Sequence, residues 1–195
     1  SFLKRRGYQN VILNWRRPQV SPDHWNPFDR VQKAYNQGDS GRDDSENYLN
    51  DLLQNLFFGR TEKGKDPYWN EVSGQIARGL CKLILKINEP LSMKSILEWR
   101  HTKMKDGTLQ NCFLALPTDS DIYQNLAGFK NLTAENTRTC IESTFDQLTG
   151  LFSSSKALTD MMSNTTFAME KIGKEKTAIF LVVPDEKTTY HFLAT

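Results

Sequence analysis

Two short apolar segments near opposite ends of the chain constrain its fold more than any other feature. Residues 8–14 are rich in β-branched side chains and lie between Gly7 and a break at Pro18, while residues 177–183 form an almost continuous apolar run stopped by Pro184. Apolar strands without alternation are typical of parallel sheets covered by helices on both faces. We therefore expect two buried strands of an α/β sheet, with residues 188–193 beginning a helix after the second strand.

Between these strands the hydrophobic spacing predicts helices. The best marked has Asp66 as N-cap and Pro67 at its first position, followed by apolar residues at intervals of three and four as far as Ile87, and Pro90 ends it. Other helices are expected over about 28–36 and 44–58, from Ser92 to about 105, over 119–126 after a Thr118 cap, from a Thr133 cap to about 153, and weakly over 158–172.

The expected fold class is mainly α: a multi-helix bundle with two flanking strands. The domains are a strand segment at 1–17, a helical domain at 18–174, and a returning strand with a helix start at 175–195. Residues 1–7 read as the last turn of a helix with Gly7 as its stop, so we expect a piece of a longer protein.

Composition excludes several function classes. The net charge of +2 gives no global attraction to nucleic acid, and no apolar run approaches the ~20 residues of a membrane span. Cys81, Cys112 and Cys140 are odd in number and widely spaced, which fits a reducing compartment, and no His or Cys pair has zinc-ligand spacing. The chain has neither GxxxxGK[ST] nor GxGxxG, so we expect no nucleotide cofactor on these residues.

The acids after the second strand allow two interpretations. Asp185 and Glu186 follow an apolar strand, as do the acids that hold Mg²⁺ in nucleoside triphosphatases, although Pro184 intervenes. They either cap the following helix or belong to a metal site. The second interpretation would make the chain a small metal-dependent α/β hydrolase or nuclease.

A local excess of positive charge is the one sequence feature that points to a binding surface. Residues 60–105 contain ten Lys or Arg against five Asp or Glu. Three of these cations recur every fourth residue and form a stripe on one helix, and four more lie on the next: Arg78, Lys82 and Lys86, then Lys94, Arg100, Lys103 and Lys105. Such a surface either meets the phosphates of nucleic acid or is a solvated helix face.

The chain resembles the conjugative coupling proteins of type IV secretion systems, the TraG/TraD-type ATPases. The resemblance is carried, in the family's order, by Gly7-Tyr8 with Val11-Ile12-Leu13-Asn14, by Trp25-Asn26-Pro27-Phe28-Asp29, by Asp66-Pro67-Tyr68-Trp69, and by residues 176–186 with 189–193. The last segment is the most specific. Residues 88–172 are similar only in helical character.

The resemblance implies a membrane-anchored, hexameric ATPase with a RecA-like nucleotide-binding domain, to which the two strands would belong. An all-α domain is inserted between its strands on the cytoplasmic face of the bacterial membrane. It would bind the relaxase, relaxosome accessory proteins, or single- or double-stranded DNA for delivery to the secretion channel. ATP and Mg²⁺ would be held by segments outside this chain, so we expect no catalysis here, and we expect the piece itself to be a soluble monomer. A third alternative is that it contacts protein alone.

Overall fold

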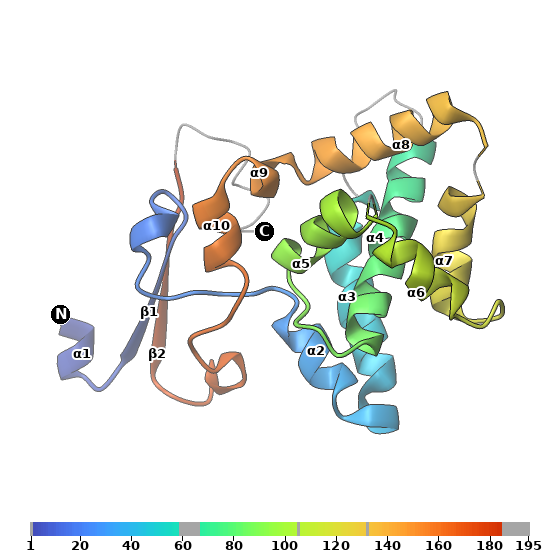
Figure 1. Cartoon of the computed structure of the whole chain (residues 1–195). Helices are drawn as coiled ribbons and strands as arrows, with labels where there is room; N and C mark the ends of the chain where they lie inside the picture. The colour runs from blue at the N-terminus through green and yellow to red at the C-terminus, as the bar shows by residue number, and fades with distance from the viewer. Residues whose placement is uncertain (1, 59–66, 105, 132, 185–195) are drawn as a thin grey trace. The chain divides into compact units, whose positions relative to one another are not determined.

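The computed structural model describes residues 2–58, 67–104, 106–131 and 133–184 (Figure 1). The described chain is mainly α-helical with a small parallel sheet, as predicted. It forms two compact units: one contains Ser1–Pro27 and Ser155–Thr195, and the other is Phe28–Ser154. The helical unit is thus narrower than the expected span of 18–174, since residues 18–27 and 155–174 belong to the unit that contains the strands.

The first unit is built on two strands distant in sequence. Strand β1 (Gln9–Asn14) follows helix α1 (Phe2–Arg5) and pairs in parallel with β2 (Thr177–Val182), with Val11 opposite Ile179. The parallel pairing confirms the interpretation of the two segments. In β1, alternate side chains are buried, but the last four residues of β2 are 36–45% exposed. The predicted burial of the second strand is therefore wrong for the described residues. Strand β1 pairs with one edge of β2, but the apolar side chains of β2 stay exposed to solvent.

The segments next to the strands are joined by backbone hydrogen bonds. After β1 come a 3-10 turn, η1 (Pro18–Val20), and an irregular stretch to residue 27; after the helical unit come α10 (Lys156–Met161) and η5 (Met169–Lys171). The backbone N–H and C=O of His24 bind Thr166, and the Asn26 N–H donates to the Thr165 hydroxyl. These bonds connect the two parts of the unit although about 140 residues of sequence separate them.

Helix α4 (Tyr68–Lys86) is the centre of the second unit. It contacts α7 (Asp121–Lys130), α8 (Glu135–Leu148), α5 (Met93–Glu98) and α3 (Arg42–Leu56), as Figure 1 lets the reader follow. Its buried face carries the apolar residues that the sequence spacing predicted, among them Ile76, Leu80 and Leu83. At Gly79 the α7 side chain of Leu126 lies so close that a Cβ would be 2.7 Å from it. A residue without a side chain therefore sets the separation of α4 and α7.

Shorter elements complete this unit. Helix α2 (Asp29–Tyr35) and the 3-10 turn η2 (Gly38–Gly41) lead into α3, and α5 continues into a π-helical turn, η4 (Trp99–Lys103). Gly107, with φ of +87°, then starts α6 (Thr108–Leu114), a helix that the sequence pattern did not indicate. The last element is α9 (Gly150–Ser153).

Several predicted helix starts differ from the structure. Asp66 lies outside the described residues, and Pro67 occupies the N-cap of α4 rather than its first turn. Ser120, not Thr118, caps α7, because its hydroxyl accepts the Tyr123 N–H at 3.3 Å. Helix α8 starts after Ala134 instead of Thr133 and ends at Leu148. The expected end at about residue 153 is instead the end of the separate short helix α9 (Gly150–Ser153). By contrast, Ser92 caps α5 as predicted, in a capping box with Ser95.

Candidate partner-binding surface of the helical unit

The basic residues of α4 have three different surroundings. Lys82 is only 13% exposed, and its Nζ contacts the Glu46 carboxylate at 2.7 Å and the Asp121 carboxylate. The Arg78 guanidinium lies 5.9 Å from the centre of the Phe58 ring, and its Nε is buried without a hydrogen-bond partner among the described residues. Lys86 is exposed on the last turn. Of the three cations in the stripe predicted from the spacing, Lys86 is exposed and the other two are partly buried.

The basic residues after α4 are also mostly engaged within the unit. Arg100 is 4% exposed, and its guanidinium contacts Glu142 at 3.4 Å and Asp146 at 3.2 Å, both on α8. The Lys103 Nζ contacts Glu89 at 2.9 Å and lies 4.4 Å from the centre of the Trp99 ring. Lys94 is exposed on α5. Lys105 lies outside the described residues.

The six predicted residues that the structure describes consequently do not form one continuous free surface. Lys82, Arg100 and Lys103 face carboxylates, and most of these acids come from α3, α7 and α8. The count of charges over residues 60–105 included Glu89 but not the acids of α3, α7 and α8, because these are distant along the chain. Cations already paired inside a fold have less to gain from a phosphate, since their own ion pairs would have to break.

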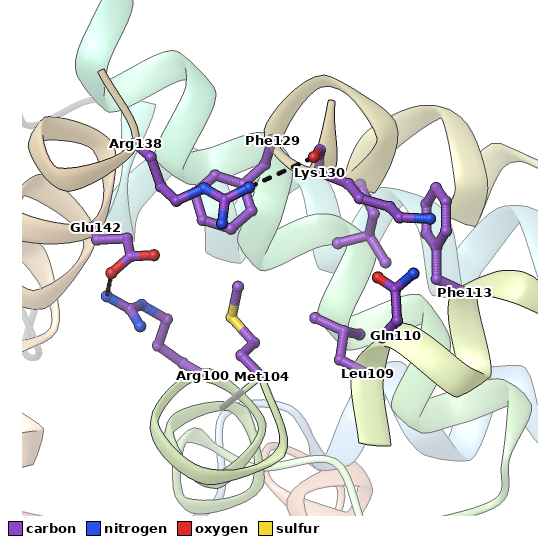
Figure 2. Close-up of a pocket in the computed structure, with 10 residues that line it drawn as sticks. Arg100, Met104, Leu109, Gln110, Phe113, Phe129, Lys130, Arg138 and Glu142 are labelled. Carbon is purple, nitrogen blue, oxygen red and sulfur yellow. Dashed lines mark hydrogen bonds and ion pairs between the residues drawn. The ribbon is translucent and has the colours of Figure 1, made fainter. Parts of the chain in front are cut away.

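A cavity of about 280 Å³ lies where η4, α6, α7 and α8 meet (Figure 2). Its apolar side chains come from three of these segments: Met104 after η4, Leu109 and Phe113 on α6, and Leu126 and Phe129 on α7. Figure 2 shows the Met104 side chain pointing into the space between α6 and α7. Among the described residues that line the cavity, Gln110 has the one side chain that is polar and uncharged.

The rim of this cavity is cationic. Lys130 at the end of α7, Arg138 on α8 and Arg100 on η4 line it, against one carboxylate, Glu142, which is held by Arg100. The Lys130 ammonium lies 4.0 Å from the centre of the Phe113 ring, and the Arg138 guanidinium lies 5.4 Å from that of Phe129. Arg138 also donates to the Lys130 carbonyl at 3.5 Å, so α7 and α8 are joined at this rim. The site therefore combines an apolar floor with positive charge at its edge.

Two titratable groups near this surface are perturbed. The indole N–H of Trp99, donated to the Glu89 carboxylate at 2.9 Å, together with Lys103, holds the pKa of that carboxyl below its usual value. Burial raises the pKa of the Cys81 thiol on α4. The hydrogen bond between Trp99 and Glu89 fixes the end of the α4–α5 connection, and Cys81 is a core residue.

No group of three potential metal ligands is found in the described part of the chain. Asp185 and Glu186, the acids of the metal-site interpretation, lie outside it. Within residues 2–58, 67–104, 106–131 and 133–184, no helix has the length and apolarity needed to cross a membrane.

Sequence reasoning singled out Arg100 among the residues that line the cavity but missed the others. Lys130 and Arg138 are separated along the chain by the connection between two helices, so no single helical period relates them to Arg100. The available signal was at the end of a helix, where the apolar residues Leu126 and Phe129 are spaced by three and the basic Lys130 follows Phe129.

Comparison with known families identifies the class of protein that this fold and surface belong to. A model of the type IV secretory system conjugative DNA transfer family matches residues 2–194, so the chain belongs to this family. No curated protein gives a significant match. The chain thus has a role in conjugative DNA transfer, and its family implies DNA and the transfer machinery as partners.

Proposed function

We propose that the helical unit is the substrate-recognition domain of a conjugative coupling protein. It binds a relaxase or a relaxosome accessory protein, at the cytoplasmic face of the bacterial membrane, for delivery to the type IV secretion channel. The observation that carries this proposal is the cavity with an apolar floor and a cationic rim. Such a combination is typical of protein-binding sites, in which buried apolar contacts give affinity and charges at the rim give selectivity.

DNA is the second candidate partner, and the surface of α4 favours it. The exposed Lys86 and the partly buried Arg78 lie two turns apart on one face, and Arg78 lines a polar cavity with the amide side chains Gln54, Gln75 and Asn125. Amides and a guanidinium can donate to phosphates and bases. DNA ranks second because Lys82, between these two residues, is already paired with carboxylates.

The unit is proposed to act by binding alone. ATP hydrolysis, Mg²⁺ binding and hexamer formation are assigned to the parent motor, with nucleotide-binding segments outside this chain. The alternative, a metal-dependent hydrolase that uses Asp185 and Glu186, predicts a stoichiometric Mg²⁺ or Mn²⁺ site. Isothermal titration of the chain with either ion distinguishes the two proposals.

The proposal is tested with the purified relaxase encoded beside this protein. The immobilised chain should retain the relaxase both with and without DNA. Retention that requires DNA would assign recognition to the nucleic acid. No retention in either condition, while the relaxase still binds the intact parent, would place recognition outside this chain.

A further inference from the structure

We infer that the cavity between η4, α6, α7 and α8 takes a short acidic–apolar peptide segment of a partner protein. One or two apolar side chains enter the cavity, and the neighbouring carboxylates bind Lys130 and Arg138. This inference rests on the proposed function, since it specifies the chemistry of the partner at that surface.

The size of the cavity fits side chains rather than a complete small ligand. Pockets for drug-sized molecules are roughly 300–1,000 Å³, whereas this one is about 280 Å³. A cavity of roughly 150 Å³ is enough for a benzene-sized group. The space therefore admits one aromatic or two branched aliphatic side chains. Its floor of Met104, Leu109 and Leu126 offers them adaptable apolar contacts.

The charge at the rim selects the residues that flank those side chains. Lys130 has no carboxylate partner among the described residues, and its ammonium rests on the ring of Phe113. Arg138 is exposed and lies on the opposite side of the opening, as Figure 2 shows. Among the described residues, three cations line the cavity against one carboxylate, and that carboxylate is engaged by Arg100. Asp or Glu in the partner is the complementary charge, and a basic segment would be repelled.

The aromatic rings argue against single-stranded nucleic acid as the occupant. Binding of unpaired bases depends on aromatic faces that are open to stacking. Phe113 is 3% exposed: it stacks on Tyr123 with the ring centres 4.3 Å apart, and Lys130 lies over the ring. Phe129 is 7% exposed and lies under Arg138. Neither ring offers a free face to a base.

An apolar surface continues from the cavity along α6. Leu114 is 69% exposed and lies one turn beyond Gln110, which lines the cavity. An exposed leucine alone needs no explanation, but beside an apolar cavity it extends the contact area available to a bound segment. A partner segment with two apolar residues about one helical turn apart would contact both features.

The test uses the full chain and three fluorescent synthetic peptides in anisotropy titrations. The first has Phe-Leu between pairs of Asp and Glu, the second replaces Phe-Leu by Ser-Ser, and the third replaces the acids by Lys. The first should bind at least tenfold more tightly than either of the others. Equal binding of the first two peptides, or tighter binding of the third, would overturn the inference.

Variants locate the binding to this cavity. The double variant Lys130→Glu with Arg138→Glu should weaken the first peptide at least tenfold, and Gln110→Trp, which fills the opening from an exposed position of α6, should do likewise. Lys130→Arg should keep the affinity, and Lys86→Glu with Lys94→Glu, an equal charge change on exposed positions of α4 and α5, should not alter it. Circular dichroism verifies that each variant is folded. An unchanged affinity in the folded double variant refutes the inference.

Two further measurements separate this inference from the proposed function. If the double variant loses the peptide but still retains the relaxase, the proposed function stands and the relaxase binds elsewhere, so the cavity is not its site. If the chain binds the peptide but never the relaxase, the proposed function fails and the chemistry of the cavity stands. A labelled oligothymidine whose affinity falls in the double variant, while that of the peptide does not, would make the cavity a DNA site.

Discussion

The close approach of α4 and α7 allows a prediction about stability with a matched control. In Gly79→Ala, the new Cβ would lie 2.7 Å from both Cγ and Cδ2 of Leu126 and 3.2 Å from the Asn125 Cβ. Cδ2 is a terminal methyl group, but Cγ is the branch point of Leu126 and the Asn125 Cβ is the root of its side chain, so α7 or the Leu126 rotamer has to shift. Gly128→Ala, on α7 itself, is the control, because its Cβ would meet no atom within 4 Å.

Two opposing effects decide the result. Alanine in a helix is favoured over glycine by about 1 kcal/mol, and this gain applies to both variants. Overpacking in a core costs about 1–3 kcal/mol, and it applies only to Gly79. We expect Gly79→Ala to lower the free energy of unfolding by about 0–2 kcal/mol and Gly128→Ala to raise it by about 1 kcal/mol. The two variants should then differ by about 1–3 kcal/mol.

Urea denaturation followed by far-ultraviolet circular dichroism measures this difference, because most of the helical signal comes from the unit that contains both glycines. The transition of that unit should move to lower urea in Gly79→Ala and to higher urea in Gly128→Ala, with the same slope. A Gly79→Ala protein as stable as the Gly128→Ala protein would refute the role given to Gly79. Adding Leu126→Val to Gly79→Ala should restore part of the lost stability, since valine has a shorter side chain than leucine at the point of contact.

Three other predictions follow from residues described above. Lys86→Glu should weaken binding of the chain to single-stranded DNA and reduce its salt dependence by about one counterion, measured by anisotropy at several salt concentrations; an unchanged slope would show that Lys86 is only a solvated residue. The lowered pKa of Glu89 contributes stability above its ordinary value of 4.5, and this contribution is lost as the pH falls through the folded-state pKa. The difference in urea midpoint between wild type and Glu89→Gln should therefore shrink below about pH 4.5. A difference that does not change with pH would show that the ionisation of Glu89 does not contribute to stability. Iodoacetamide at pH 8 should modify the exposed Cys140 but not the buried Cys81, whose pKa is raised, as mass spectrometry of the digested protein can determine; rapid modification of Cys81 would contradict its burial.

Local sequence signals predicted the elements that local chemistry determines. The apolar spacing and the proline before Tyr68 were enough for α4, and Ser92, a favoured N-cap residue after Pro90, was enough for the start of α5. The parallel pairing of β1 and β2 followed from their apolar composition. Helix α6 was missed because residues 108–114 have a mixed composition, and its start depends on the left-handed backbone of Gly107.

The candidate site could be predicted less well, because it depends on contacts between distant segments. The charge of Arg100 is visible in the sequence, but its burial against Glu142 and Asp146 is not, since these acids come from a helix about 40 residues later. The same holds for Lys82 with Glu46 and Asp121. The cavity joins four segments, and no period in the sequence relates its cationic rim to its apolar floor.

The pairing of β1 with β2 has a consequence for the order of folding. The 162 residues numbered 15–176 separate the two paired strands, so joining them closes a very long loop. Each halving of an effective loop lowers the closure entropy cost by about 0.6 kcal/mol. If the helical unit, which is compact within residues 28–154, folds first, it removes these residues from the flexible loop and makes the later pairing less costly. We therefore expect the amide of Val11 to gain hydrogen-exchange protection after those of α4 during refolding. Simultaneous protection would indicate that strands and helices form in one step.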